Sequence, residues 1–571
     1  MSDITTEATD LSTTVPREDP TPFGWLNTAD HKRIGRLFIG TSLMFLGLGL
    51  ILDLLVRLDL TDDSDFVALD ADTFGQLFVF GRESLVFLFL IPVFLGLAIY
   101  LVPLQVGASN LAFPRAGAAA FWGWLVSAGV FVGAYAGNGG PYGGWDDGVD
   151  LYMLALGGMV VSLLIGYIAV ATTVLTERSP GMFLDRAAPF AWSTLVTASM
   201  LVVSLPVLLG QLVILYVDHR YGHVFLGGNF GIWGRIDWVV KTPTMFIYLV
   251  PVLGVAAEVV IATARRRVLE PLAMYFTIGL VGLFGFGAWM NFSITNEGSD
   301  LGDGFEGVVL VALYGGAALG ATALVALLGF ALFQSRKSLK LGGLNTSVLG
   351  VLGAGKFVVA AALYGLLGAG VDWLEIAGRG NDGNPYLRDT TWATGQQSIL
   401  IYGAGLLGLV AALHWWAPKI WGRTLNDLLG KLTLLLIAVG ATLASLGPAL
   451  SGLLYDQPDL AYLDPAQTSL YAEAVDGGGA EAMAWLGTAG LLVVIAGALL
   501  FMLNLVVSLV LRNGTKADSD PWDGAAPEWM LDSPPRPGIL DALPDLDSGT
   551  PLLDMAEAGG DEQDAAEEVK V

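Results

Sequence analysis

The chain has 571 residues, of which 54% are hydrophobic and 14% are charged, and its formal net charge at pH 7 is −25. Together with a mean hydropathy of +0.64, this composition excludes an ordinary soluble globular protein. The absence of cysteine excludes disulfides, iron–sulfur clusters, Cys-ligated zinc and a thiolate copper centre. No nucleic-acid partner is expected.

Twelve apolar stretches are long enough to cross a bilayer, which takes about 20 residues of α-helix. In chain order they lie at approximately 34–57, 76–103, 117–136, 150–177, 188–217, 240–264, 270–295, 306–334, 344–372, 396–416, 427–455 and 480–512. The sequence therefore predicts an all-α membrane protein whose twelve transmembrane helices contact the lipid bilayer.

Lysine and arginine are concentrated at one set of helix ends, whereas the opposite loops are rich in Gly, Asn and Asp. The cations of the first set are Lys32, Arg33, Arg36, Arg178, Arg186, Arg265, Arg266, Arg267, Arg336, Lys337, Lys340, Lys419 and Arg423. Because short cytoplasmic loops carry the excess of Lys and Arg, we expect both termini to be cytoplasmic in a multi-pass protein of the cell membrane.

Three regions are expected along the chain. An acidic cytoplasmic N-terminal tail (1–24) has no basic start and does not match a cleavable signal. The membrane domain spans 25–513, and an acidic cytoplasmic tail spans 514–571. Beyond about residue 537, the Pro, Gly, Ala and Asp content cannot form a core, so we predict that most of this tail is disordered.

Four segments outside the spans carry a specific resemblance. Thr28–Gly35 opens the first span, Leu101–Arg115 follows the second, His414–Pro418 closes the tenth, and Pro521–Trp529, continuing to Pro535, follows the twelfth. In order, spacing and number of helices the chain resembles subunit I of the haem–copper oxidases, the cytochrome c oxidase type. The resemblance covers roughly residues 25–537 and implies the twelve-helix bundle of that family.

The resemblance also implies two haems and a copper ion held by six histidines, one of which is cross-linked to a tyrosine. Imidazole is a good ligand for both metals. This chain has four histidines in total: His31, His219, His223 and His414. We predict that all four lie at or beyond helix ends and that none lies deep in the membrane.

Carried over residue by residue, the family's ligand positions hold other residues in this chain. They fall on Gly81 in the second span, Thr242 and the tyrosine position Phe246 in the sixth, Asn291 and Phe292 in the seventh, and Gly395 and Gln397 in the tenth. The arginine pair that anchors the haem propionates falls on Leu453 and Leu454, and the family's proton-path glutamate falls on Thr244. We therefore predict no haem, no copper, no other metal and no catalytic residue.

Two alternative metal sites can be considered. Met245 and Met290 lie near the lost copper position, although methionine in an apolar helix usually fills the core. The spacing of His219 and His223 would place two imidazoles on one face of a helix. The glycines around this pair favour two hydrated loop histidines instead.

Charged residues inside the spans are the remaining candidates for a site. Arg82 and Glu83 adjoin the first vacated position, Lys356 lies within the ninth span, and Glu258 lies in the second half of the sixth. Because charges in a membrane usually pair inside the bundle, we predict that Glu83 pairs with Arg82 or Lys356. This network is either a salt bridge that fills the haem space, or a proton or ion relay or anion-binding cavity. Asp53, near an outer helix end, is expected to be solvated.

Three functions are possible. The favoured one is a haem- and copper-less pseudoenzyme that acts as a scaffold or subunit of a membrane complex, with a subunit II-like or III-like partner. The alternative is a conduit for protons, ions or small solutes through the vacated haem cavities, lined in part by Thr242, Thr244, Asn291 and Gln397. The resemblance alone would imply a terminal oxidase of the respiratory chain, which the missing ligands contradict.

Overall fold

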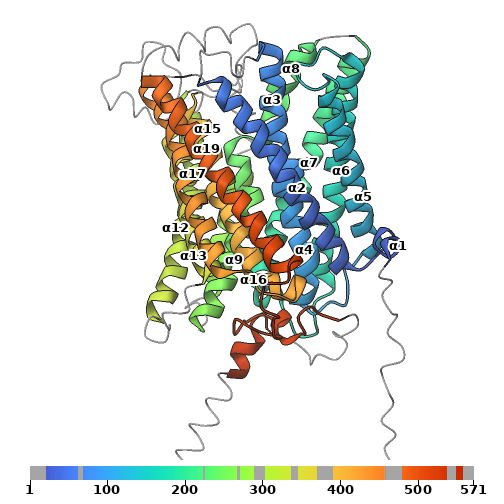
Figure 1. The fold of residues 1–571 in the computed structure, drawn as a ribbon, viewed down its shortest axis with the longest axis vertical. Helices are drawn as coiled ribbons and strands as arrows, with labels where there is room; N and C mark the ends of the chain where they lie inside the picture. Colours follow the sequence, from blue (N-terminus) through green and yellow to red (C-terminus); the bar gives the residue numbers. More distant parts are fainter. Residues whose placement is uncertain are drawn as a thin grey trace, which may run out of the picture.

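The computed structural model is a bundle of long, roughly parallel helices (Figure 1). It describes residues 21–61, 69–222, 225–265, 271–287, 303–335, 345–368, 387, 390–455, 457, 479–536 and 548–556. No strand occurs among these residues, where the only sheet-like contact is an isolated bridge between Arg423 and Lys516. The predicted all-α class is confirmed.

The first half of the chain contributes six of the long membrane helices. Its elements are α1 (Pro22–Leu26), α2 (His31–Asp59), α3 (Ala71–Glu83), a π-helical segment (Ser84–Leu90), α4 (Ile91–Val106), α5 (Pro114–Ala136), α6 (Asp146–Thr176), α7 (Pro189–Arg220), α8 (Gly228–Ile236) and α9 (Thr242–Ala264). Helices α3 and α4 and the segment between them form one continuous rod, Asp72–Val106, which is apolar enough to cross a membrane.

In its described part, the second half of the chain contributes the other five long apolar helices. Its elements are α10 (Pro271–Gly287), α12 (Asp303–Gln334), α13 (Thr346–Gly368), α15 (Trp392–Ser398), a π-helical segment (Ile399–Leu406), α16 (Leu407–Trp421), α17 (Asp427–Tyr455), α19 (Gly479–Leu505) and a last π-helical segment (Val506–Val510). In the described part of the chain, eleven helices are long and apolar enough to span, and α10 supplies a shorter apolar helix at Leu272–Gly285. Each of the twelve predicted stretches coincides with a helix.

Local sequence explains where several helices begin and end. The Asp30 side chain caps α2 by accepting a hydrogen bond from the Lys32 backbone N–H at 3.1 Å. Helices α4 and α16 end at Gly107 and Gly422, whose φ angles of 75° and 71° lie in the left-handed region that glycine adopts at little cost.

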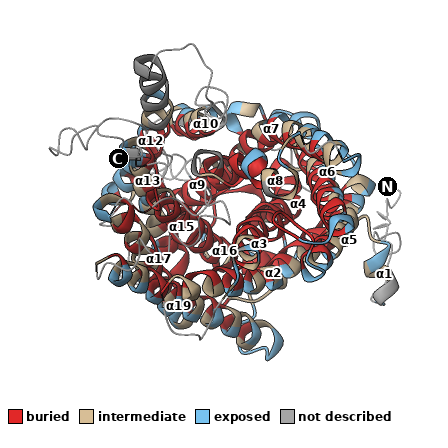
Figure 2. Ribbon diagram, turned by 90° about the horizontal axis from the view of Figure 1, so that it is seen from above, coloured by how far each residue is buried: buried red, intermediate tan, exposed pale blue. Residues whose placement is uncertain are grey.

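Three rods form the centre of the bundle. These rods are Asp72–Val106, Met245–Ala264 and Trp392–Trp421. In each rod, all residues of the most apolar 18-residue stretch are buried inside the protein. Viewed from above, α4, α9 and α16 lie within a ring of the other helices (Figure 2). Apolar composition alone does not mark these positions, because the most apolar stretch of the outer helix Gly479–Val510 has a mean hydropathy of 2.7 and that of the central rod Trp392–Trp421 one of 1.7.

The chain after α19 folds back against one end of the bundle, the same end at which α1 lies (Figure 1). The indole N–H of Trp522 donates to the Trp415 carbonyl at 2.9 Å, and the Trp529 ring packs edge-on against Trp415. The start of the predicted C-terminal tail is therefore ordered on α16. Further along, the Gly549 N–H donates to the Arg186 carbonyl at 2.6 Å.

Candidate functional site

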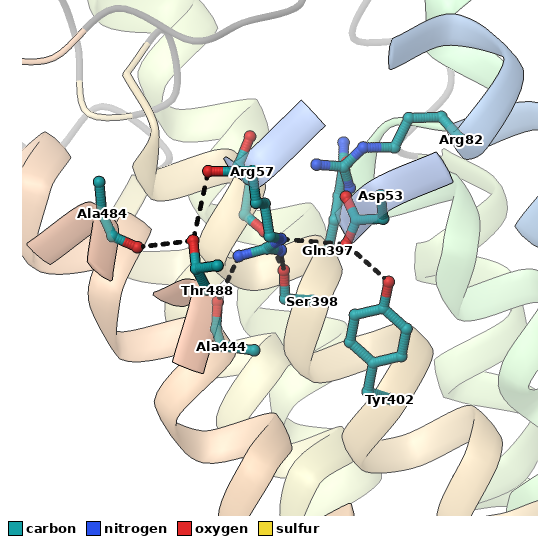
Figure 3. Close-up of polar contacts among 10 residues, drawn as sticks. Asp53, Arg57, Arg82, Gln397, Ser398, Tyr402, Ala444, Ala484 and Thr488 are labelled. Carbon is teal, nitrogen blue, oxygen red and sulfur yellow. Dashed lines mark hydrogen bonds and ion pairs between the residues drawn. The ribbon is translucent and has the colours of Figure 1, made fainter. Parts of the chain in front are cut away.

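A buried polar cluster joins the last turns of α2 to α15, α17 and α19, at the end of the bundle opposite α1 (Figure 1 and Figure 3). Arg57 Nε donates to Asp53 Oδ2 at 3.0 Å, one helical turn apart on α2, and the hydroxyl of Tyr402 donates to the same oxygen at 2.8 Å. The other Arg57 nitrogens donate to Ser398 Oγ at 2.8 Å and to the Ala444 carbonyl at 3.3 Å. The expectation that Asp53 is solvated is wrong, because Arg57 neutralises its charge within the bundle.

Arg82 is the second arginine of this cluster. Its Nη1 donates to Gln397 Oε1 at 2.5 Å, which links α3 directly to α15. The guanidinium carbon lies 5.3 Å from the centre of the Phe78 ring, a cation–π arrangement. Arg82 Nε is buried and has no hydrogen-bond partner.

A cavity of about 40 Å³ lies between these side chains. Its lining includes both arginines and one carboxylate, several hydroxyl-bearing side chains, and apolar residues. The lining residues are Asp53, Val56, Arg57, Leu60, Phe78, Arg82, Thr391, Thr394, Pro448, Ser451, Ala484 and Thr488. This volume suffices for a few water molecules, since one water needs roughly 10–15 Å³ by the same measure.

The vacated ligand positions on α3 and α15 face away from each other. A Cβ atom on Gly81 would lie 3.3 Å from Leu52 Cβ on α2, and one on Gly395 would lie 2.7 Å from the Ser445 carbonyl oxygen on α17. Of the vacated positions in these two helices, only Gln397 lies at the contact between α3 and α15. Its carboxamide oxygen accepts the hydrogen bond from Arg82.

The vacated positions of the sixth and seventh spans are only partly described. Phe246 is buried on α9, and a Cβ on Gly285 of α10 would lie 3.0 Å from its Cβ. Thr242 begins α9, but its side chain and that of Thr244 lie outside the described residues, as do Met290, Asn291 and Phe292.

The two positions predicted for propionate anchors lie near the end of α17. Leu453 packs against an apolar cluster formed by Leu387, Trp392 and Ala449, whereas the Leu454 side chain is exposed. Neither leucine is among the residues that line the polar cavity.

The structure does not bring the predicted charge network together. Both oxygens of Glu83 accept hydrogen bonds from tyrosines: Oε1 from Tyr152 at 2.6 Å and Oε2 from Tyr135 at 2.9 Å. Lys356 is exposed on α13, whereas Arg82 bonds to Gln397. Among the ion pairs of the described residues, none joins Glu83 to Arg82 or to Lys356.

Glu258, the fourth member of the predicted network, belongs to a separate site. Its Oε2 accepts from the Phe190 N–H at 3.3 Å, and its carboxyl group lies close enough to that of Glu528, in the C-terminal segment, for the two to repel each other when charged. Glu528 Oε1 accepts from Gln105 at 3.1 Å and from the Trp416 indole at 3.0 Å. Burial raises the pKa of the Glu528 carboxyl above its ordinary value.

The described histidines serve as structural residues. His31 is buried at the first position of α2, and His219 Nδ1 lies 2.8 Å from Asp150 Oδ1 near the end of α7. His414 corrects the prediction that all histidines lie at helix ends: it lies inside α16, which continues to Trp421, and its Nδ1 lies 2.9 Å from the Val410 carbonyl oxygen. His223 lies outside the described residues.

No group of three or more His, Asp or Glu residues in the described ranges is arranged to hold a metal ion. Sequence reasoning missed Arg57, Tyr402 and Ser398 as site residues. The spacing of Asp53 and Arg57, four residues apart on a helix, was the available signal. The partners of Arg57 on α15 and α17 could not be found this way, because they lie more than 300 positions away.

Comparison with known proteins identifies relatives that share this architecture. The chain is 27% identical over 562 residues to cytochrome c oxidase subunit 1 of Bacillus subtilis, covering 95% of this chain and 85% of that protein. It is also 27% identical over 556 residues to the subunit of the same name from Synechocystis, covering 93% of both chains.

A heme-copper terminal oxidase dimer solved by electron cryo-microscopy has the same fold, with a TM-score of 0.62 and 12% identity over 84% of both chains. The family model for cytochrome c and quinol oxidase polypeptide I matches residues 33–490, which is more than half of the chain. This protein is therefore a member of the cytochrome c and quinol oxidase polypeptide I family.

Proposed function

We propose that this protein is a non-redox member of its family, which holds neither haem nor copper and acts as a scaffold subunit of a membrane complex. The observation that carries the proposal is the 2.5 Å hydrogen bond between Arg82 and Gln397. This bond joins α3 to α15, the two helices on which the family resemblance places haem-ligating histidines.

The donor chemistry around this bond supports the proposal. Haem iron in proteins is held by His, Cys, Met or Tyr, whereas glycine has no side chain and the Gln397 oxygen is already bonded to a guanidinium. A shift of one residue along α15 would place the pair on Gln396 and Ser398, which bond to the Ala361 carbonyl and to Arg57. The side chains in either register do not fit the usual ligands of haem iron.

Packing between the central rods supports the same conclusion for the second haem and the copper ion. A Cβ on Gly405 would lie 2.8 Å from a Leu90 methyl carbon and 3.2 Å from one of Leu249, so apolar side chains fill the contact. A Cβ on Gly408 would lie 2.4 Å from a Val252 methyl carbon. At these two positions the central helices pack directly against each other, which supports the proposal for this stretch of the bundle.

The contacts between the C-terminal segment and α16 support the scaffold role. The C-terminal segment is held to α16 by indole hydrogen bonds, and Lys419 Nζ donates to the Ser519 carbonyl at 2.7 Å. These contacts organise one face of the bundle without any cofactor. A relative in Aeropyrum pernix is named heme-copper oxidase subunit I+III, which supports a subunit III-like partner for this chain beside the subunit II-like alternative.

Haem and metal content test the proposal directly. The full chain is purified from its native membrane in mild detergent, assayed as a pyridine haemochrome and analysed for copper by mass spectrometry. We expect neither in stoichiometric amount, whereas a ligand-bearing subunit I prepared in parallel carries both. One haem or more per chain would contradict the proposal.

The scaffold role has its own test. Affinity purification of the tagged chain from its native host is expected to recover a membrane protein of the subunit II or subunit III type in constant ratio. A chain that is recovered alone after mild solubilisation and cross-linking contradicts the assembly role, whatever its haem content.

The conduit alternative gains no specific support from the described residues. Glu83 is enclosed by two tyrosines, and Lys356 faces outward. Flux through proteoliposomes, compared between the parent, Glu83→Gln and Lys356→Met, would revive it only if the parent conducts and these variants do not.

A further inference from the structure

The polar cavity between α2, α3, α15, α17 and α19 has an imbalance of charge. Its lining includes two guanidinium groups, those of Arg57 and Arg82, and one carboxylate, that of Asp53. Within the described ranges the lining therefore carries one more positive than negative charge.

The single carboxylate is hydrogen-bonded to Arg57, while Arg82 interacts with it only through charge and at longer range. Its Nε bonds to Asp53 Oδ2, and two further nitrogens have oxygen partners on Ser398 and Ala444. Of the five N–H donors of a guanidinium, three are thus used by protein acceptors at distances of 2.8–3.3 Å. The Arg57–Asp53 pair is electrically neutral and well bonded.

Arg82 has no hydrogen-bonded carboxylate among the described residues and has fewer hydrogen-bond acceptors than Arg57. In the described part of the chain its one hydrogen-bond acceptor is Gln397, a neutral carboxamide, and its buried Nε has no partner there. The residue is 6% exposed, so bulk water does not hydrate the charge. The guanidinium group stays protonated in proteins, so this charge is permanent.

Such a charge calls for a counter-ion. A buried charge without an ionic partner in a medium of low dielectric carries a desolvation penalty, which a bound ion of opposite charge offsets. Arg82 lines a cavity that is about 40 Å³ in volume, enough for a small inorganic ion with a water molecule and too small for an organic acid of any size.

We propose that the cavity beside Arg82 and Arg57 binds one chloride-sized monovalent anion, which neutralises the surplus arginine charge and joins α2, α3 and α15. The cavity is lined by residues from helix ends opposite the termini, among them Leu60 after α2 and Ala484 in the second turn of α19. This inference rests on the proposed absence of haem, because a haem between α3 and α15 would displace the anion.

Binding of radioactive chloride to the purified full chain tests the inference, after the haemochrome assay has been completed on the same preparation. The parent is expected to bind one chloride per chain, with competition by bromide and none by gluconate. Its thermal midpoint in detergent is expected to be a few degrees higher in sodium chloride than in sodium gluconate of equal ionic strength, because a ligand that binds the folded state alone stabilises it.

Three variants assign the site. Arg82→Gln should abolish chloride binding and the chloride-dependent part of the thermal midpoint, whereas Arg82→Lys keeps the charge and should retain binding with lower affinity. Lys356→Gln removes one cation from an exposed position and should bind as the parent does. If Arg82→Gln does not fold, Arg82→Lys and the stoichiometry of the parent still decide the matter.

The outcomes separate the two proposals. A haem-free parent that binds no chloride, or an Arg82→Gln variant that binds as tightly as the parent, overturns the anion site and leaves the non-redox proposal standing. Stoichiometric haem overturns the non-redox proposal, and the anion site falls with it.

Discussion

The carboxyl group of Glu83 is held by two phenols instead of a cation. Tyr135 and Tyr152 each donate to one of its oxygens, and the Phe80 ring stacks on Tyr135 with ring centres 4.3 Å apart. The sequence could identify Glu83 as a buried acid in an apolar helix, yet it could not identify the partners. Two tyrosines on different helices leave no periodic signal, because a helix pattern records which face is apolar and not which hydroxyl meets which acid.

Replacing Glu83 by leucine should therefore destabilise the bundle. The change leaves two buried hydroxyls without their acceptor, at a cost of about 1–3 kcal/mol for each unsatisfied group. The free energy of unfolding in mixed detergent micelles measures the loss. The triple variant Glu83→Leu, Tyr135→Phe, Tyr152→Phe removes donors and acceptor together and should recover most of it; equal instability of the single and triple variants would contradict the hydrogen-bonded arrangement.

Glu528 should make stability depend on pH. Burial raises its pKa in the folded state above the ordinary value of 4.5. Its contribution to stability is therefore complete below that ordinary value and is lost as pH rises through the raised one. The thermal midpoint of the parent should fall over this window more steeply than that of Glu528→Gln. Glu177→Gln, at an exposed position, should follow the parent, and identical slopes for all three proteins would exclude Glu528 as the source.

At the scale of elements, hydropathy located every span but not every end. The tenth stretch was predicted at 396–416, whereas the continuous helical rod runs over Trp392–Trp421. Lys419 lies in the turn beyond residue 416. A charged residue at that position lowers the hydropathy, so the sequence alone predicts that the span has already ended. Its ammonium group is satisfied by the Ser519 carbonyl of the C-terminal segment. That contact spans 100 positions, so only the folded chain reveals that the helix can continue.

Close approach of α2 and α4 gives a test of the bundle's packing. A Cβ on Gly96 would lie 2.6 Å from Phe38 Cβ and 3.0 Å from the Gly35 carbonyl oxygen, whereas one on Gly40 meets nothing within 4 Å. Gly96→Ala should force the helices apart and cost about 1–3 kcal/mol of unfolding free energy. Gly40→Ala adds the same atom and should be neutral or slightly stabilising, since alanine favours helix by up to about 1 kcal/mol. Equal effects of the two changes would show that the helices are not in contact here.

For the whole molecule, the fold could be predicted from the sequence and the polar site could not. The apolar spans and the four peripheral segments were enough to predict the bundle. A backbone that crosses lipid must satisfy its hydrogen bonds internally, and an α-helix does so. The site depends on one direct bond between α3 and α15, and the residues it joins, Arg82 and Gln397, are separated by 315 positions. Asp53 was expected in solvent for the same reason, since its position near a helix end gives no information about Tyr402.

Orientation in the membrane can be tested with unusual clarity because the chain contains no cysteine, so that each introduced thiol is the only one present. Thr21 and Asn513 are exposed at the cation-rich end of the bundle, and Asp146 is exposed at the opposite end, where α6 begins. By the positive-inside rule, an impermeant maleimide should label Asp146→Cys in intact cells and should label Thr21→Cys and Asn513→Cys only after lysis. The reverse pattern would show the opposite orientation, with the helix ends that line the Arg82 cavity on the cytoplasmic side.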